Sequence, residues 1–529
     1  MFKVFVADKL APEGIAALKE YPGIEIDFTP GLEVDAALAH AADADAIIVR
    51  SETKIRGKLL EAARQLRVIG RAGIGVDNID LEAVTERGIV VLNTPDANAT
   101  TTAELAIAHL FSLSRQLPEA DRSVRGGAWE RSRFMGSEVT GKTLGVIGFG
   151  TIGRLVAERA RGLKMRVLGF DPFVTPETFT QYGVEGVTLE AMLAVADYVT
   201  LHCPVTEDTR NLLNAARLAS MKKGARVINC ARGGLLDEQA LLELVNTGHL
   251  AGAALDVFEK EPPGASPLYS QPRIQFTPHL GASTQEAQTA VGVEIAHQIA
   301  AFLIRNEVRN AVNLKSIAPD RLVQMAPYLT LARHLGKLLS LMSDGALLEI
   351  EVGLFGRAAD LEAQPLLCEV VAGVFQDHLA TPINRVNALP LARRQGIKIS
   401  ELKSPDSKDY LAMVRVRGRS AAGTLCLEGT LFDERHARLV RVNDYEIEAA
   451  LEGQLVMTRH ADQPGVIGAI GEILGRAGIN ITRMQVGASE GKARAIAVIG
   501  VSDALSEETL AALAAIEPVD KVLQVYFEC

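Results

Sequence analysis

Residues 143–171, "TLGVIGFGTIGRLVAERARGLKMRVLGFD", decide the fold of the central part of the chain. An apolar strand leads into Gly148, Gly150 and Gly153, which have G-x-G-x-x-G spacing. A helical stretch follows, and a second apolar strand ends at Asp171, 18 residues after Gly153. The spacing alone is weak in a glycine-rich chain, but its place between a strand and a helix predicts a dinucleotide-binding unit.

Each position in this motif has a physical task. Gly148 permits a tight turn, Gly150 lets backbone amides approach a pyrophosphate, and Gly153 lets helix and strand pack closely. Asp171 can accept hydrogen bonds from ribose hydroxyls and would repel a 2′-phosphate. Proline and phenylalanine follow it rather than arginine, so the sequence favours NAD over NADP.

Working outward, short apolar runs alternate with helical stretches from residue 3 to 278. Continuous apolar strands separated by helices predict doubly wound parallel sheets that are covered on both faces. One such sheet does not normally hold eleven strands, so we place a boundary near the helix at 101–117. The expected strands are "KVFVAD", "IEIDF", "AIIVR", "RVIGRAG", "IVVLN", "TLGVIGFG", "RVLGFD", "YVTLHC", "RVINC", "AALDVF" and "RIQFTP".

The rest of the chain divides into further units. A long helix from residue 285 could return to pack on the first sheet, and residues 454–527 read as strand, helix, two strands, helix, strand, the ferredoxin-like order. We therefore expect an α/β protein with two Rossmann-like domains, an α+β intervening domain and a small, separate ferredoxin-like domain. The expected boundaries are 1–96 with 285–314, then 97–284, 315–452 and 453–529.

Composition indicates an ordinary globular protein of three or four domains, with 48% hydrophobic and 23% charged residues. The net charge of −10 argues against general nucleic-acid binding. With no signal peptide and no apolar run of spanning length, we expect a cytoplasmic protein away from membranes. The scattered cysteines lack metal-binding spacing, which predicts reduced thiols and no structural metal; they are Cys203, Cys230, Cys368, Cys426 and Cys529.

Three side chains after successive strands suggest a reactive site at one edge of the second sheet. Arg232 lies between a strand and two glycines that leave it uncovered, Glu261 follows the next strand, and His279 follows the last. Taken singly, each also has a plain structural interpretation. Together they favour reversible alcohol oxidation, because a carboxylate fixes a histidine's tautomer and stabilises its protonated form, while an arginine binds a carboxylate.

These segments resemble a known family. "GFGTIG", "CARGG", "DVFEKEPP" and "TPHLGAST" are similar to motifs of the D-isomer-specific 2-hydroxyacid dehydrogenases. "VRSETK", "GRAGIGVDNID", "NTPDANATTTAELA" and "AWERSRFMG", with an ACT-like terminus, narrow the resemblance to long-form D-3-phosphoglycerate dehydrogenases. The likeness is specific over 45–285 and looser over 315–450, where that form carries an intervening domain described as binding substrate allosterically.

The resemblance implies a reaction: NAD-dependent oxidation of 3-phosphoglycerate to 3-phosphooxypyruvate, the first step of L-serine biosynthesis. His279 would take the C2 hydroxyl proton, Glu261 would orient it, and Arg232 would hold the carboxylate and C2 oxygen. Implied substrate contacts are Arg50, Ser51, Arg71, Gly73, Gly75, Val76 and Asn98. Implied cofactor contacts, besides the glycines and Asp171, are Ile74, Thr151, Ile152, Cys203, Cys230, Ala231, Asp256, Gly281 and Ala282.

The resemblance also implies regulation and assembly. In the ACT-like segment His460, Asp462 and Asn480 match the family's serine contacts at a dimer of such domains, so L-serine is the expected effector. A homo-oligomer built as a dimer of dimers is expected, and Arg131 and Arg133 lie where the family's dimer arm approaches the neighbouring subunit's site. An ACT domain kept for assembly alone stays an alternative.

Two other functions fit the same motifs. Another D-2-hydroxyacid dehydrogenase, acting on glyoxylate, hydroxypyruvate or 2-oxoglutarate, would use the same arginine, glutamate and histidine. A dinucleotide-sensing protein of the corepressor type would use the fold to recruit partners. The C-terminal half and the paired Arg50 and Arg71 weigh against the first of these, and the ACT-like terminus and the absence of a low-complexity tail weigh against the second.

Overall fold

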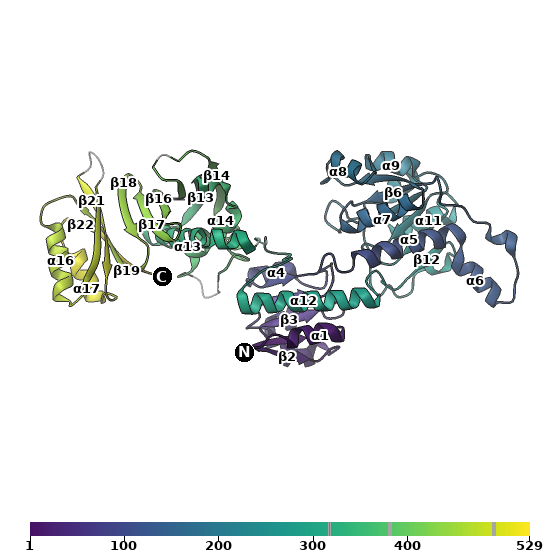
Figure 1. Ribbon diagram of the computed structural model, residues 1–529, viewed down its shortest axis with the longest axis horizontal. Coiled ribbons are helices and arrows are strands. Elements are labelled where there is room, and N and C mark those ends of the chain that lie inside the picture. The colour runs from purple at the N-terminus through teal and green to yellow at the C-terminus, as the bar shows by residue number, and fades with distance from the viewer. Residues whose placement is uncertain (316, 318, 379–382, 408, 489–492, 529) are drawn as a thin grey trace.

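The structure, a computed structural model, describes residues 1–529 except 316, 318, 379–382, 408, 489–492 and 529. Cys529 therefore lies outside the described residues. Within the described part the chain forms four sheets. Figure 1 shows the first sheet in the middle of an elongated molecule, the second at one end and the two C-terminal sheets at the other.

Residues 2–92, all of which are described, form a five-stranded parallel sheet in the order β2-β1-β3-β4-β5. Every residue of β3 and β5 is buried, as expected for strands covered on both faces. The strands are β1 (Phe2–Val6), β2 (Ile24–Phe28), β3 (Ala46–Val49), β4 (Val68–Arg71) and β5 (Val90–Leu92). The helices are α1 (Pro12–Lys19), α2 (Val34–Ala41), α3 (Gly57–Ala62) and α4 (Leu81–Glu86).

Residues 143–276, also fully described, form a seven-stranded parallel sheet in the order β12-β11-β10-β9-β6-β7-β8. Its strands are β6 (Thr143–Ile147), β7 (Arg166–Phe170), β8 (Glu185–Gly186), β9 (Tyr198–Leu201), β10 (Arg226–Asn229), β11 (Gly252–Leu255) and β12 (Ile274–Phe276). Its helices are α7 (Thr151–Gly162), α8 (Pro176–Gln181), α9 (Leu189–Val195), α10 (Ala215–Ser220), α11 (Glu238–Asn246) and the 3-10 turn η2 (Pro267–Ser270). The sequence predicted eleven strands in the two sheets and missed β8, whose two exposed residues carry no apolar pattern.

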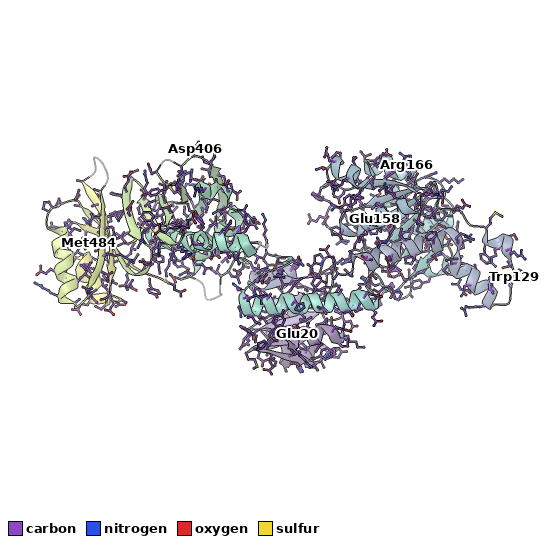
Figure 2. The ribbon with its side chains drawn as sticks, in the orientation of Figure 1. Glu20, Trp129, Glu158, Arg166, Asp406 and Met484 are labelled. Carbon is purple, nitrogen blue, oxygen red and sulfur yellow. The ribbon has the colours of Figure 1, made fainter. Side chains whose placement is uncertain are left out.

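Between the two sheets the chain forms a long helix and a projecting arm. Helix α5 (Ala99–Arg115) packs against α7, and α6 (Leu117–Arg125) and η1 (Arg131–Phe134) extend away from the body (Figure 1). Trp129 lies at the outer end of this arm (Figure 2) and is 76% exposed. Exposed apolar side chains are concentrated on the arm; they are Leu117, Val124, Trp129 and Met135.

Helix α12 (Gln285–Arg305) leaves the second sheet and packs on the first. It approaches α1 closely at Gly14 and Gly292, where a Cβ on Gly14 would meet the Gly292 backbone at 2.8 Å. Ile295 and Ile299 fill the space beside Gly70 of β4. By length and composition α12 is the one described helix that could cross a membrane, yet most of it is buried inside the protein, as in a core helix.

Outside the gaps at 379–382 and 408, residues 347–450 form a six-stranded mixed sheet in the order β14-β13-β15-β16-β17-β18. The long helices α13 and α14 pack against each other beside it. The strands are β13 (Leu347–Gly356), β14 (Lys398–Ser404), β15 (Ala412–Ser420), β16 (Gly423–Phe432), β17 (His436–Val442) and β18 (Tyr445–Ala450). The helices are α13 (Pro319–Met342), η3 (Arg357–Asp360), α14 (Ala363–Phe375) and α15 (Ala388–Arg394).

Apart from 489–492, residues 453–527 form an antiparallel sheet in the order β20-β21-β19-β22, with two helices. This is the ferredoxin-like arrangement that the sequence predicted. The elements are β19 (Gly453–Ala461), α16 (Val466–Arg476), β20 (Ile481–Ala488), β21 (Arg494–Val501), α17 (Glu507–Ala514) and β22 (Val519–Phe527).

The two C-terminal sheets share one hydrophobic core, so the last unit is less separate than we expected. Leu455, Met457 and Phe527 of the ferredoxin-like sheet belong to the same buried cluster as Leu335 of α13 and Ile447 of β18. The ring of His334 lies 4.4 Å from that of Phe527. The sequence pattern could not reveal this shared core. A sheet with two apolar faces gives the same pattern whether its second face packs on another unit of the same chain or on a partner chain.

Candidate active site and effector sites

The loop between β6 and α7 forms a cradle that side chains would fill. Gly148 has a φ of +89°, and a Cβ there would meet the His202 backbone at 2.6 Å. A Cβ on Gly153 would overlap the carbonyl oxygen of Gly148. At Gly150, by contrast, a Cβ would meet no described atom within 4 Å, so the space before the first turn of α7 is open. The first amides of a helix face such a space, and they bind phosphate groups.

Asp171 closes this cradle at the end of β7. Its carboxylate accepts hydrogen bonds from the backbone amides of Phe149, at 2.9 Å, and Phe173, at 2.9 Å. Each oxygen keeps a further lone pair that could accept a ribose hydroxyl. The open amides and this carboxylate fit the pyrophosphate and ribose of NAD, and the carboxylate would repel the phosphate of NADP.

Most other predicted cofactor residues begin α7 or follow strands β9, β10 and β12. The Thr151 hydroxyl donates to Asp96, at 3.3 Å, and the Ala231 amide donates to Asn229, at 3.1 Å. Burial raises the pKa of Cys203 to about 11 and that of Cys230 further, so both thiols stay protonated. Ile152 lies at the start of α7, and Gly281 and Ala282 lie on the loop after β12.

The predicted reactive residues lie together because three neighbouring parallel strands end at the same edge. Arg232 follows β10, Glu261 follows β11 and His279 follows β12. His279 Nδ1 lies 2.6 Å from Glu261 Oε2. Because an ionised carboxylate only accepts, Nδ1 carries the proton, and Nε2 of the neutral ring is left as a base.

Glu261 is suited to remain ionised beside this ring. Burial raises its pKa, but the hydrogen bond and charge of His279, the Phe258 amide and the charge of Arg232 outweigh burial and hold the pKa of Glu261 below its ordinary value. The Phe258 amide donates to Glu261 Oε1 at 3.0 Å. The carboxylate therefore has one oxygen for the backbone and one for the histidine.

The first sheet contributes two further cations opposite this edge. Arg50 follows β3 and Arg71 ends β4. Burial, with the charges of Arg232 and Arg50, lowers the pKa of Arg71 to about 10, and burial also lowers the pKa of Arg50. Three mutually repelling guanidinium groups at one place are costly unless an anion binds there.

The glycine loop after β4 lets these cations approach the backbone. The Arg71 guanidinium lies where a side chain at position 73 would be. The Arg232 guanidinium lies where a side chain at position 75 would be. Arg232 Nε donates to Asp77, at 2.9 Å, and so joins the two sheets. Val76 belongs to the same loop, and Ile74 accepts a hydrogen bond from Asn93 at 2.6 Å.

Ser51 and Asn98 lie at the margins of this site. Ser51 is exposed directly after Arg50. Asn98 is 6% exposed at the start of α5, and its Oδ1 has no hydrogen-bond partner among the described residues. An unpartnered buried amide oxygen is suited to accept a hydrogen bond from a ligand hydroxyl.

Asp256, a predicted cofactor residue, lies against the loop that carries His279. It is fully buried, and its carboxylate accepts the Thr277 hydroxyl at 2.6 Å, the Leu280 amide at 2.7 Å and the Gly281 amide at 2.9 Å. The carboxylate thus holds the loop that carries His279, and its contact with the cofactor stays a prediction.

Sequence reasoning also missed residues that fix the substrate loops. Asp8, 2% exposed, accepts the Arg50 amide at 2.6 Å and the Thr53 hydroxyl at 2.5 Å. The Asn78 side chain donates to the Arg50 carbonyl at 2.9 Å. The available signal was a single acidic residue at the end of β1, which reads equally well as a turn former.

The predicted serine contacts do not meet within one chain. His460 pairs with Ala495 near one end of the sheet, whereas Asn480 precedes Ile481, which pairs with Val501 at the level of Gln454. Six residues of strand separate the two levels, about 20 Å. His460 is 2% exposed and Asp462 is exposed beside it. A site that uses both His460 and Asn480 needs a second copy of this sheet.

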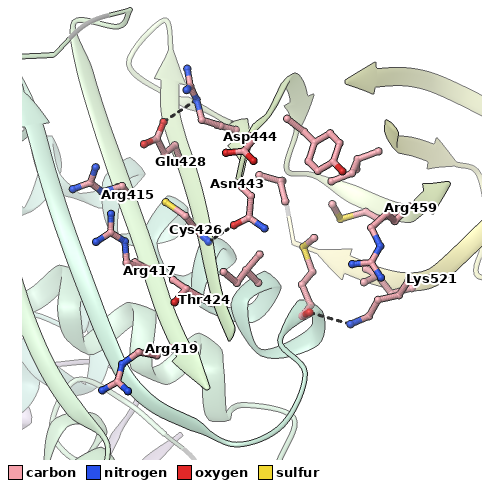
Figure 3. A pocket seen from close by; sticks show the side chains of 18 of the residues that line it. Arg415, Arg417, Arg419, Thr424, Cys426, Glu428, Asn443, Asp444, Arg459 and Lys521 are labelled. Carbon is pink, nitrogen blue, oxygen red and sulfur yellow. Dashed lines mark hydrogen bonds and ion pairs between the residues drawn. The ribbon is translucent and has the colours of Figure 1, made fainter. Parts of the chain in front are cut away.

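A cavity of about 920 Å³ lies between β13, β15 and β16 of the six-stranded sheet and the β19 and β22 strands of the ferredoxin-like unit. Figure 3 shows Arg415, Arg417 and Arg419 along one strand, and Arg459 and Lys521 on the opposite side of the cavity. Its described cations are Arg415, Arg417, Arg419, Arg441, Arg459 and Lys521, against the carboxylates Glu349, Glu351, Glu428 and Asp444. The cavity is therefore net positive and is large enough for a small organic anion.

A nucleotide cradle facing an arginine, glutamate and histidine at the carboxyl ends of a doubly wound sheet defines a nicotinamide-dependent dehydrogenase. Residues 107–281 match the model of the D-isomer specific 2-hydroxyacid dehydrogenase NAD-binding domain. Residues 324–443 match the D-3-phosphoglycerate dehydrogenase intervening domain, and residues 454–518 match the ACT domain.

Curated relatives extend this likeness over nearly the whole chain. The chain is 40% identical to D-3-phosphoglycerate dehydrogenase of Synechocystis sp. over 96% of its own length and 92% of the relative's. It is 41% identical to that of Archaeoglobus fulgidus, over 93% of each chain. The chain belongs to the D-3-phosphoglycerate dehydrogenase family.

Solved structures match the first two sheets. A glyoxylate reductase from Paecilomyes thermophila is 29% identical with a TM-score of 0.54, covering 59% of this chain and 98% of its own. D-lactate dehydrogenase from Escherichia coli is 26% identical with a TM-score of 0.53, covering 59% of this chain and all of its own. Enzymes named for different substrates thus share this catalytic fold, so the side chains of the site must select the substrate.

Proposed function

We propose that the chain catalyses the NAD-dependent oxidation of 3-phospho-D-glycerate to 3-phosphooxypyruvate, the first step of L-serine biosynthesis. The observation that carries this proposal is the convergence of Arg50, Arg71 and Arg232 opposite the His279–Glu261 pair. A substrate with a carboxylate at one end and a phosphate at the other needs cations at both. A single arginine would suffice for lactate or glyoxylate.

The chain's residues divide the chemistry among them. NAD, when bound, accepts the hydride that leaves C2. His279 Nε2 takes the C2 hydroxyl proton, and in the reverse direction returns it. Glu261 keeps Nδ1 protonated and stabilises the charged ring. Arg232 binds the substrate carboxylate and stabilises negative charge on the C2 oxygen, while Arg50 and Arg71 bind the phosphate.

The test is the initial rate of NADH formation with 3-phosphoglycerate, D-2-hydroxyglutarate and glycolate as separate substrates. The proposal expects selective oxidation of 3-phosphoglycerate with NAD, and a much lower rate with NADP. Preference for either unphosphorylated acid would favour a different 2-hydroxyacid dehydrogenase. Tight NADH binding without turnover of any of them would favour a sensing protein.

We propose further that L-serine inhibits the reaction at a pair of ACT sheets from two chains. The placing of His460 and Asn480 at opposite ends of one sheet supports a shared site, because a neighbouring copy could bring the two together. Serine should lower the rate of the native protein and not that of Asn480→Ala. Equal inhibition of both would remove Asn480 from the serine site.

The cationic cavity supports a second regulatory proposal, that the intervening unit binds a small organic anion. Glu351 Oε1 lies 3.8 Å from Arg415 and 3.6 Å from Arg417, too far for hydrogen bonds, and Arg415 Nε has no partner among the described residues. These groups are suited to a ligand that both accepts and donates hydrogen bonds. Calorimetric titration with 3-phosphoglycerate should lose one class of sites in Arg417→Ala; an unchanged isotherm would contradict this.

We also propose a cytoplasmic homo-oligomer in which the arm at 117–136 contacts a neighbouring subunit. The exposed Trp129 and Met135 support this, because a projecting apolar segment is stabilised by burial in an interface. Light scattering of the native protein and of a Trp129→Ser, Met135→Ser variant tests it. The same mass for both, at one chain, would contradict the proposal.

A further inference from the structure

A buried polar pair on α5 lies beneath the loop that carries His279. Thr102 and His109, both 6% exposed, are seven residues apart and so lie on one face of the helix. The Thr102 hydroxyl donates to the Gly281 carbonyl at 2.8 Å. His109 Nε2 lies 3.2 Å from the Thr277 hydroxyl. One helix thus contacts the loop on both sides of His279.

The direction of each hydrogen bond can be assigned. Thr277 must donate its hydroxyl proton to the carboxylate of Asp256, 2.6 Å away, because an ionised carboxylate only accepts. The Thr277 oxygen is then an acceptor for His109 Nε2–H. Burial lowers the pKa of His109, against the charge of Asp256, so the ring is neutral with its proton on Nε2. The chain of bonds runs from His109 through Thr277 to Asp256.

Asp256 in turn holds the backbone of His279 in an unusual conformation. His279 has a φ of +55°, a left-handed conformation that non-glycine residues adopt only when their surroundings enforce it. The Asp256 carbonyl accepts the His279 amide at 2.9 Å, and its carboxylate accepts the next two amides. Asp256 therefore fixes the backbone of His279 and of the two residues after it, through its carbonyl group and its carboxylate.

We propose that His109 is a positioning residue for His279. The Nε2–H of His109 occupies a lone pair of the Thr277 hydroxyl oxygen, so the hydroxyl proton of Thr277 points to Asp256. Asp256 then holds the loop so that Nε2 of His279 faces the substrate. A leucine would fill the same apolar face of α5 without the cost of burying an imidazole, so packing alone does not account for a histidine here. This inference rests on the proposed dehydrogenase function.

A double-mutant cycle on the full-length protein tests the coupling. His109→Leu should lower kcat about tenfold, with the KM for NAD unchanged, because a positioning hydrogen bond is lost. Thr277→Val should do the same, and adding His109→Leu to Thr277→Val should cost nothing more. His109→Gln, which keeps an N–H at a similar reach, should restore most of the rate. The matched control is Leu110→Ala, another buried change on α5, which should lower stability and leave kcat close to native.

Two results would overturn the inference. Additive losses in the double variant would show that His109 does not act through Thr277, and a His109→Gln variant as slow as His109→Leu would remove the donor's role. Should His109→Leu fail to fold, Thr277→Val, which keeps the volume of the side chain, and His109→Gln still test the same link.

A second measurement separates this inference from the proposed function. Diethyl pyrocarbonate modifies accessible histidines, and peptide mass spectrometry gives its rate at His279, whose side chain is 43% exposed. A loosened loop should raise that rate several-fold in Thr277→Val and leave it unchanged in Leu110→Ala. This needs no turnover, so the loop can be tested even if 3-phosphoglycerate is not the substrate. An unchanged rate in Thr277→Val would contradict the positioning role.

Discussion

His279 has a left-handed backbone conformation, and Nδ1 of its ring is hydrogen-bonded to the carboxylate of Glu261. Each feature restricts the ring, and together they leave Nε2 as the atom that can accept a proton. The residues around it act in the same way: Glu261 fixes the tautomer, Asp256 fixes the loop, and Arg232 reaches across to the first sheet. Substitutions at these residues should therefore affect proton transfer and cofactor binding separately.

Replacement of His279 by alanine should abolish turnover while NADH still binds. The imidazole is the proposed base, whereas the nucleotide cradle lies on different strands, β6 and β7. General acid–base groups typically contribute 10²–10⁴-fold in rate, so a loss of about that size is expected. NADH fluorescence titration beside steady-state rates is the measurement. Turnover within threefold of native would remove His279 from the mechanism.

Glu261→Gln should change the pH dependence of the reaction as well as its rate. The pKa of Glu261 lies below its ordinary value, so the residue is an anion across the neutral range and stabilises the protonated ring of the base. Glutamine keeps the hydrogen bond but removes the charge, so the base should lose its proton more easily. The acid limb of the kcat/KM profile should therefore move to lower pH. A limb that stays in place, or moves up, would show that the charge of Glu261 does not act on the base.

At the scale of helices and strands, the glycine motif, eleven short apolar strands and the ferredoxin-like order could be predicted because each is a local pattern. Glu261 and His279 could be paired because their strands are consecutive in the sequence and neighbours in the sheet. The residues that hold the reactive site in place could not be predicted in this way. Asp8, Thr102 and His109 act through contacts that join segments far apart in the chain, and singly they look like a turn residue and two helix residues.

Two glycines of the cradle should respond oppositely to the same substitution. A Cβ on Gly150 faces open space, so Gly150→Ala should leave the melting temperature near native and raise the KM for NAD about tenfold by crowding the pyrophosphate. A Cβ on Gly153 would overlap the Gly148 carbonyl, so Gly153→Ala should destabilise the protein by about 1–3 kcal/mol. Calorimetry and NAD titration of both variants test this. A Gly150→Ala variant that binds NAD normally would place the pyrophosphate elsewhere.

For the whole molecule, the structure joins the C-terminal units more closely than the sequence suggested. Leu455, Met457, Val525 and Phe527 share one core with α13 and β18, so we expect the last two sheets to unfold together. The sequence predicted a boundary at residues 452–453 from strand order, with no signal of how much apolar surface crosses it. A ligand that changes the conformation of the ACT sheet would therefore also change the packing of the intervening unit.

Truncation after residue 452 should consequently destabilise what remains rather than release an unregulated enzyme. Removing four fully buried side chains from a shared core costs about 6–12 kcal/mol at about 1.5–3 kcal/mol each. The truncated chain should unfold or aggregate in its C-terminal part, as seen by hydrogen exchange over 324–450. Native protection of that region in the truncated chain would show that the two units fold independently.

The cations at the two facing sheet edges should select a phosphorylated 2-hydroxyacid. This selectivity is tested most directly by the ratio of kcat/KM for 3-phosphoglycerate to that for D-glycerate, which differ only in the phosphate. Because the site leaves Arg50 and Arg71 unpaired when the phosphate is missing, the ratio should be at least about 10². A ratio near one would contradict the claim, since the chain would then oxidise the acid without using the phosphate.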